Sequence, residues 1–461
     1  RTGVVFSQAG EHRSRTIAPV PRTGRAGTIR SVRKSLLLVA LLLLVPAPAA
    51  ANGQSTHVWI THAAIERLPD GPLAELLRRP ELRDIVVNGT MFPDWGYAPG
   101  GSRDHGEASH WEPFQQEYRR WIQESFDAPY TAGEAAAHTA FFFGMASHGM
   151  ADEHFDALFM ERSRCYDVGW NAEDNAGLDT ASDVLFMAQV GGIPQPERWL
   201  PTEALATVYA RAMPELPLDV DGMEMGHRML HVAVAAVDAL RTNEERIATF
   251  AADWAWSAEH LSDASVPGSP SDEADAVALY WLELCDRLQG ATSWTDPVLA
   301  MHPRPGSWGH SRDSSKPEAR IHLALARGTR SDSLDAITVA TADGEDVPLD
   351  VGLFYGDRSH ALLARPLQDW DEDTSYVVTV APGLESHDGD LSEASFVASF
   401  STGPEPPPTP PQDDPPAGCG SSVAGATGSR LGLLALSAAA CAAALRRRRG
   451  GCAAPGGRLL E

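Results

Sequence analysis

Two patterns of hydrophobic residues divide the middle of the chain. Between residues 52 and 308, apolar residues recur every three or four positions in runs bounded by proline, glycine and cap residues, a spacing that predicts helices. Between residues 316 and 403, short runs of β-branched residues alternate with turn sequences such as DGED and HDGD, which predicts strands. We therefore expect an all-α domain followed by a small all-β sandwich.

The longest apolar run lies between residues 132 and 162, contains no proline and includes the aromatic cluster that begins at Phe141. This composition predicts a buried helix. Residues four apart share one face of a helix, so His148, Asp152 and Asp156 form a stripe of one imidazole and two carboxylates. Burying such a stripe is costly unless a cation neutralises it, and imidazole with carboxylate is a common ligand set for zinc. A solvated helix face is the competing interpretation.

Further helices are predicted around this central one, each with a helical spacing of apolar residues and a start or stop signal at its ends. They cover residues 57–68, 71–87, 203–213, 222–241, 243–260 and 272–288.

The predicted strands lie in the sequences ARIHLALA, DAITVAT, SYVVTVAP and SFVASFSTG. Through YVVTV at residues 376–380 and the closing FSTG at residues 400–403, this segment resembles the bacterial immunoglobulin-like modules of secreted proteins. It contains no acid–base pair or ligand cluster that stands out in the sequence. We therefore expect it to act as a spacer or adhesion module.

The charge balance of the chain is strongly acidic. Its 461 residues include 62 acidic and 37 basic side chains, which gives a formal net charge of −25. Such a surface repels the phosphates of nucleic acids, so no nucleic-acid partner is expected. Cys165 and Cys285 could pair in an exported protein, although two cysteines alone do not establish a disulfide.

The first 51 residues are expected to form a leader and a signal peptide. Basic residues at 30–34 precede the apolar run SLLLVALLLLV and the small residues at 49–51, an order that is typical of secretory signals. The apolar run is short for a membrane span, and the small residues favour cleavage before Asn52. The protein is therefore predicted to be exported.

The end of the chain has a second apolar run. It begins after the stiff, proline-rich sequence PEPPPTPPQDDPP, covers residues 423–445 and ends at four arginines. A glycine–cysteine pair, an apolar helix and an arginine cluster in that order resemble the C-terminal sorting tag of myxobacterial surface proteins; a plain tail anchor is the alternative. The expected organisation is a leader (1–51), a helical domain (52–308), a β-sandwich (316–403), a linker (404–417), a sorting or anchor segment (418–449) and a tail (450–461).

Four short motifs in the helical domain place histidine or aspartate beside aromatic residues. In order they are THVWI at 56–60, FPDW at 92–95, SHW at 109–111 and FGMASHGMAD at 143–152. Their order and flanks resemble those of the zinc-dependent phospholipase C family, and most nearly the N-terminal catalytic domain of glycosylphosphatidylinositol-specific phospholipases D. The resemblance covers residues 52–184.

This resemblance implies an all-α fold that binds up to three zinc ions. The first ion would be bound by Asp94, His110, His148 and Asp152. Asp152 would bridge to the second ion. That ion would also be bound by His57 and by the amino and carbonyl groups of a mature N-terminus at Asn52.

The third zinc site departs from the family pattern. The family has a histidine one turn after the helix aspartate, where this chain has Asp156. His154 lies two residues after Asp152 and should point elsewhere, because two helical residues turn by about 200°. In the later histidine–acid pair, Asn175 replaces the histidine, Asp179 fits the acid and Asp183 lies one turn beyond. A site of Asp156, Asp179 and Asp183 should bind its ion more weakly or prefer Ca²⁺ or Mg²⁺.

The resemblance implies hydrolysis of phospholipid head groups of the phospholipase C or D type. Clustered zinc activates water near neutral pH and neutralises charge on phosphoryl oxygens. Candidate general bases near the cluster are Glu107, Glu153 and Asp174. Tryptophans beside the ligands either line an aromatic substrate pocket or pack in the core. They are Trp59, Trp95 and Trp111.

The expected protein is thus an exported, surface-associated zinc phosphodiesterase, with a phospholipid or glycolipid at a membrane as its partner. A single-strand nuclease on the same zinc scaffold is one alternative, although it would be expected to have a base-stacking groove and less negative charge. A catalytically weak adhesion protein that has lost the third metal is another. Cleavage on either side of the phosphate, and choline or inositol head groups, are all compatible with the sequence.

Overall fold

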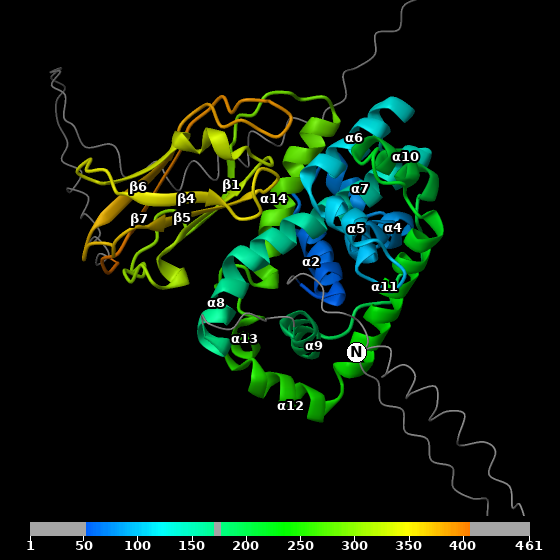
Figure 1. The fold of residues 1–461 in the computed structure, drawn as a ribbon, viewed down its shortest axis with the longest axis horizontal. Coiled ribbons are helices and arrows are strands. Elements are labelled where there is room, and N and C mark those ends of the chain that lie inside the picture. The colour runs from blue at the N-terminus through cyan, green and yellow to red at the C-terminus, as the bar shows by residue number, and fades with distance from the viewer. Residues whose placement is uncertain (1–51, 170–176, 406–461) are drawn as a thin grey trace, which may run out of the picture. The chain divides into compact units, whose positions relative to one another are not determined.

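The computed structural model describes residues 52–169 and 177–405. In this part of the chain a helical region is followed by two antiparallel β-sheets (Figure 1). A search of the described residues finds no helix with the length and apolar character that a membrane span requires. The predicted signal peptide, the candidate base Asp174, most of the proline-rich linker and the C-terminal sorting segment lie outside these residues.

The helical region combines α-helices with short 3₁₀ and π segments. The α-helices are α2 (Gln54–Arg67), α3 (Pro72–Leu77), α4 (Pro80–Met91), α5 (Arg103–His110), α6 (Glu112–Ser125), α7 (Gly133–His154), α8 (Glu161–Ser163), α9 (Leu178–Val190), α10 (Thr202–Ala212), α11 (Val220–Leu240), α12 (Glu244–Asp253), α13 (Ala255–His260) and α14 (Pro270–Leu288). The 3₁₀ segment η1 covers Phe92–Gly96, and the π segments are η2 (Phe155–Met160) and η3 (Arg164–Val168).

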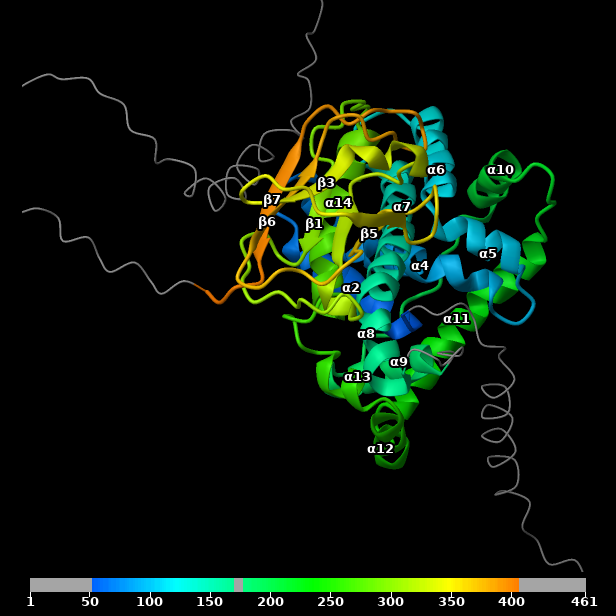
Figure 2. The ribbon, with the colours of Figure 1, turned by 60° about the vertical axis from the view of Figure 1, so that its left-hand side comes forward.

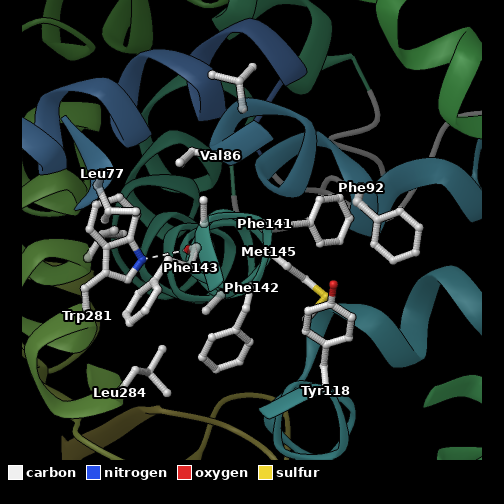
Figure 3. Packing of buried hydrophobic residues seen from close by; sticks show 14 of the residues in the cluster. Leu77, Val86, Phe92, Tyr118, Phe141, Phe142, Phe143, Met145, Trp281 and Leu284 are labelled. Carbon is white, nitrogen blue, oxygen red and sulfur yellow. Dashed lines mark hydrogen bonds between the residues drawn. The ribbon is translucent and has the colours of Figure 1, made fainter. Parts of the chain in front are cut away.

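Helix α7 is the core of the helical region. Every side chain from His138 to His154 is buried, because this stretch is almost entirely apolar or small. Figure 3 shows its aromatic residues packed among side chains of the surrounding helices, and Trp281 of α14 donates a hydrogen bond of 2.8 Å to the carbonyl of Phe143. A helix that is buried on all sides in this way fixes the positions of its polar residues relative to its neighbours.

Glycines let the backbones around α7 approach closely. A Cβ atom on Gly144 would lie 2.0 Å from the carbonyl oxygen of Val86 in α4. At Gly149, a Cβ atom would lie 2.0 Å from the carbonyl oxygen of His110, at the end of α5. Only glycine fits at such distances. The two contacts hold α7 against the elements that carry the aspartate and histidine motifs.

The helix does not continue with α geometry after His154. The six residues of η2 form a π-helix, whose turn is wider than that of an α-helix. The sequence predicts one α-helix from 132 to 162, so the stripe that it assigns to His148, Asp152 and Asp156 holds only for its first two members.

The β region consists of two sheets with a shared core. Leu323 and Leu362 of one sheet pack with Val339, Val378 and Phe400 of the other. The first sheet has the order β1-β2-β5-β4, and the second has the order β3-β6-β7. The strands are β1 (Val298–His302), β2 (Ile321–Leu325), β3 (Ile337–Thr341), β4 (Leu349–Leu353), β5 (Ala361–Pro366), β6 (Ser375–Val380) and β7 (Phe396–Ser401). An immunoglobulin-like topology stays a prediction.

The β region packs directly on the helical region. Helix α14 lies beside β1 (Figures 1 and 2). The carboxylate of Glu153 in α7 accepts hydrogen bonds from the hydroxyl of Ser359 and the backbone amides of His360 and Ala361, at 2.6, 2.6 and 2.8 Å. Because Glu153 is 2% exposed, this contact fixes the loop before β5 against the core helix.

Most predicted elements have counterparts in the structure, with differences at prolines and strand edges. The run 71–87 is divided at Pro80 into α3 and α4, because proline begins a helix more readily than it continues one. Strand β1 belongs to the first sheet, although the sequence places its residues in the helical domain. Helices α5, α6 and α9 were missed, and so were β1, β4 and β5. Within the described residues Cys165 and Cys285 form no disulfide.

We expect Gly149→Ala to weaken metal binding at the end of α7. The added methyl group would displace the carbonyl of His110, lowering the free energy of unfolding by about 1–3 kcal/mol. Metal affinity should fall by about 10- to 100-fold, because a histidine held by that backbone segment would shift. Zinc titration and thermal melting measure both effects. Gly352→Ala, in open space on β4, is the control; equal zinc affinity in the two variants would contradict this account.

Candidate metal centre

Three histidines and two aspartates from four elements meet in the helical region. Helix α7 provides two of them and its neighbours provide the rest. All but one are at most 4% exposed, and the exception, Asp94, has 22% of its side chain exposed. They are His57 on α2, Asp94 on η1, His110 at the end of α5, and His148 and Asp152 on α7.

Four of these residues direct ligand atoms at one point. The Nε2 atom of His110 lies 3.1 Å from Asp94 Oδ1 and 3.5 Å from Asp152 Oδ2. The Nε2 atom of His148 lies 3.1, 3.2 and 3.6 Å from His110 Nε2, Asp152 Oδ2 and Asp94 Oδ1. Tetrahedral zinc with bonds of about 2.0–2.1 Å places its ligand atoms about 3.3 Å apart. The observed spacing fits one such ion.

The tautomers of the two histidines are fixed from behind. Nδ1 of His110 lies 2.8 Å from the carbonyl oxygen of Gly106, and Nδ1 of His148 lies 2.7 Å from that of Thr90. A carbonyl oxygen only accepts, so both Nδ1 atoms carry the hydrogen and the Nε2 atoms of the neutral rings present lone pairs. These lone pairs face carboxylate oxygens, which also only accept. A cation between them resolves the conflict, and backbone support of this kind is typical of metal-binding histidines.

Asp152 presents one oxygen to each of two groups. While Oδ2 faces His110 and His148, Oδ1 lies 2.9 Å from Nε2 of His57. Within the described residues, neither Oδ1 of Asp152 nor Nε2 of His57 has a hydrogen-bond partner, despite this distance. The ring of His57 stacks on that of His148, with centroids 3.9 Å apart. Asp152 therefore has the placement of a carboxylate that bridges two ions.

The charges in this cluster are strongly coupled. Burial acts to lower the pKa of His148, but the carboxylates of Asp152 and Asp94 outweigh it and raise that pKa to about 10. Burial acts to raise the pKa values of Asp94 and Asp152, yet the histidines hold both well below the usual range. The group therefore attracts positive charge, which a divalent cation supplies without a shared proton.

An acidic pocket adjoins Asp152. Burial raises the pKa values of Asp156 and Glu273 well above the usual range, and the charge of Asp152 adds to both effects. Asp156 accepts a hydrogen bond from the hydroxyl of Tyr355, and Glu273 accepts one of 2.6 Å from the side chain of Asn52. The buried Asn52 is thus near the bridging aspartate, but its role as a terminal ligand stays a prediction. Glu273, in the first turn of α14, was missed by the sequence analysis.

The other residues assigned to a third ion lie apart from this pocket in function. Asp183 accepts hydrogen bonds from the backbone amides of Ser55 and Thr56, at 3.1 and 2.7 Å, so it anchors the first turn of α2. Burial raises its pKa to about 6. Asp179 is buried in the first turn of α9. In the described part of the chain, no three-residue ligand group includes Asp156, Asp179 or Asp183. The third ion therefore stays a prediction.

The tryptophans have different surroundings. Trp95 is fully buried and donates a hydrogen bond of 2.8 Å to Tyr209, so it is a core residue and not part of a pocket wall. Trp59 is half-buried, edge-on to Phe186. The ring of Trp111 lies beneath the guanidinium of Arg358, 4.8 Å from its centroid.

The candidate bases are engaged in other contacts. Glu107 accepts a hydrogen bond of 3.1 Å from the indole of Trp111 and forms an ion pair with Arg358. Glu153 is held by the loop before β5, as described above. In both cases the carboxylate already stabilises a neighbouring side chain or loop.

Comparisons with known proteins give one consistent relationship. No family model matches the chain. It is similar to phosphatidylinositol-glycan-specific phospholipase D of Rattus norvegicus (30% identity, 37% of this chain and 22% of the relative), Mus musculus (32%, 37% and 22%) and Homo sapiens (31%, 34% and 20%). The chain spans only about a fifth of the length of these relatives. The S-layer protein rSbsC(31-844) matches 69% of this chain and 45% of its own at 7% identity, but its TM-score of 0.19 carries no argument. The similarity supports a phospholipase-D-like relationship.

We expect Asp152→Asn and Asp183→Asn to have different effects on metal content. Asp152→Asn should remove the bridging charge and release two ions per chain, as measured by elemental analysis of the purified protein. Asp183→Asn should keep its metal but lower the free energy of unfolding by about 1–2 kcal/mol, because its carboxylate anchors α2. Loss of an ion from Asp183→Asn would instead make it a ligand.

Proposed function

We propose that the protein is a zinc-dependent phosphodiesterase that hydrolyses the head group of a phospholipid or glycolipid, with phospholipase C or D specificity. The observation that carries this proposal is the group of imidazole lone pairs and carboxylates around Asp152. The printed activity of the similar proteins, phospholipase D, supports the substrate class. Zinc bound there would supply Lewis acidity, activating water and neutralising charge on the phosphoryl group.

The chain's own residues indicate the side from which substrate approaches. Asp94 is the most exposed of the five clustered residues. Next to it, the ring of Tyr97 lies 5.5 Å from that of His110, and its hydroxyl donates a hydrogen bond to Glu107. Arg358 pairs with the same glutamate at 3.1 Å and is 41% exposed. A cation at this position would attract a phosphate toward the centre and orient it.

Export and surface attachment are part of the proposal. The signal-like sequence before Asn52 and the apolar run with arginines near the end of the chain support them. An exported protein of this kind would meet lipid at a membrane surface, in keeping with the predicted substrate.

The proposal is tested with the full chain, loaded with zinc and incubated with vesicles of phosphatidylcholine or phosphatidylinositol and with single-stranded DNA. We expect lipid hydrolysis, no release of nucleotides, and loss of activity in Asp152→Asn. Diacylglycerol as product would show cleavage of the phospholipase C type, and phosphatidic acid that of the phospholipase D type. Nuclease activity without lipid hydrolysis, or a folded, zinc-loaded protein inactive on every substrate, would contradict the proposal.

The mature terminus is open to a separate test. If the amino group of Asn52 binds the second ion, a protein that begins at Asn52 should hold one more zinc ion than the same protein with a methionine added before it. The buried position of Asn52 beside Glu273 leaves little room for an extension. Equal zinc content and activity in the two proteins would exclude the terminal ligand.

A further inference from the structure

A second group of buried ligand-type side chains lies where the helical region meets the first sheet. His154 ends α7, Asp272 lies in the first turn of α14, His302 ends β1 and His322 lies in β2. Each is between 1% and 6% exposed. Ligand atoms of His154, Asp272 and His302 lie within 4.8 Å of one another. The group shares no residue with the centre around Asp152.

The distances in this group are those of ligands around one ion. Oδ2 of Asp272 lies 3.3 Å from Nε2 of His154 and 3.0 Å from Nε2 of His302. As at the first centre, tetrahedral zinc separates its ligand atoms by about 3.3 Å. Two remote helices and a strand therefore bring three donors together in a compact arrangement.

His322 adds a fourth imidazole. It is paired directly with His302 across β1 and β2, and residues paired in this way project from the same face of a sheet. Its ring centroid lies 4.8 Å from that of His154 and 6.2 Å from that of His302. The sheet thus directs both histidines at the end of α7.

Hydrogen bonding alone does not account for the group. It accounts for Asp272, which accepts from His154 and, at 2.9 Å, from the amide of Gly268. It does not account for His322, both of whose ring nitrogens are buried without a partner in residues 52–169 and 177–405. Burying such a ring costs free energy unless its nitrogen is used. A metal ion uses it.

We propose that His154, Asp272, His302 and His322 bind a structural zinc ion that joins the helical region to the first sheet. Three imidazoles and one carboxylate complete a tetrahedral shell, and imidazole-rich sites favour zinc. A complete protein shell leaves no position for substrate, so the role is to stabilise the interface. A cavity of about 640 Å³, lined by His302, Arg304 and the exposed Trp308, gives the ion a path from the surface.

The test is His322→Leu in the full chain, with zinc counted by elemental analysis and melting followed by calorimetry. We expect one fewer zinc ion per chain and a lower melting temperature in the presence of zinc. In chelator, the variant should melt at or above the wild-type temperature, because an unpaired buried imidazole has been removed. Unchanged zinc content together with a higher melting temperature in zinc would overturn the proposal.

Two further variants make the result independent of the first centre and of misfolding. His310→Leu removes another partly buried histidine of the β region outside the group and should keep its zinc. Asp152→Asn should lose the ions of the first centre but keep the ion of this site. Loaded with cobalt(II), Asp152→Asn should show the visible absorption of one tetrahedral ion. Its absence in a folded protein would overturn the proposal even if His322→Leu does not fold.

Discussion

The described structure depends on one electrostatic constraint: a buried carboxylate, Asp152, faces imidazole nitrogens that have no hydrogen to give it. Backbone carbonyls of Thr90 and Gly106 impose this by taking the other nitrogen of each ring. Those carbonyls are in place because glycines let α4 and the end of α5 lie against α7. The tight packing of the core and the affinity of the centre for a cation are therefore results of the same contacts.

The first centre could be predicted from sequence because its signals are local. Each ligand lies in a short motif with recognisable flanks, and His148 and Asp152 are one α-helical turn apart. The third site could not be predicted in the same way. The π-helix after His154 changes the direction of Asp156, the partners of Asp183 are amides of α2, and Glu273 and Tyr355 come from distant parts of the chain. No local pattern reports such contacts.

The β region shows the same limit for a different reason. The second sheet contains the strands with β-branched runs that the sequence identifies, such as β6, whose buried and half-buried positions alternate. Strand β5 has no such alternation, because all but one of its residues are buried. A strand covered on both faces loses the period of two and reads as an apolar run of either type. Its contact with α7 through the preceding loop provides that second cover.

The last turn of α7 places three consecutive side chains in three different surroundings. Asp152 joins the histidine cluster, Glu153 holds the loop before β5, and His154 lies against Asp272. A rotation of this turn would disturb all of them together. The helical and β regions are for this reason poor units of exchange: a chain cut between them would leave an anion and an imidazole of the core facing water. Recombination in this architecture must keep both regions from the same parent.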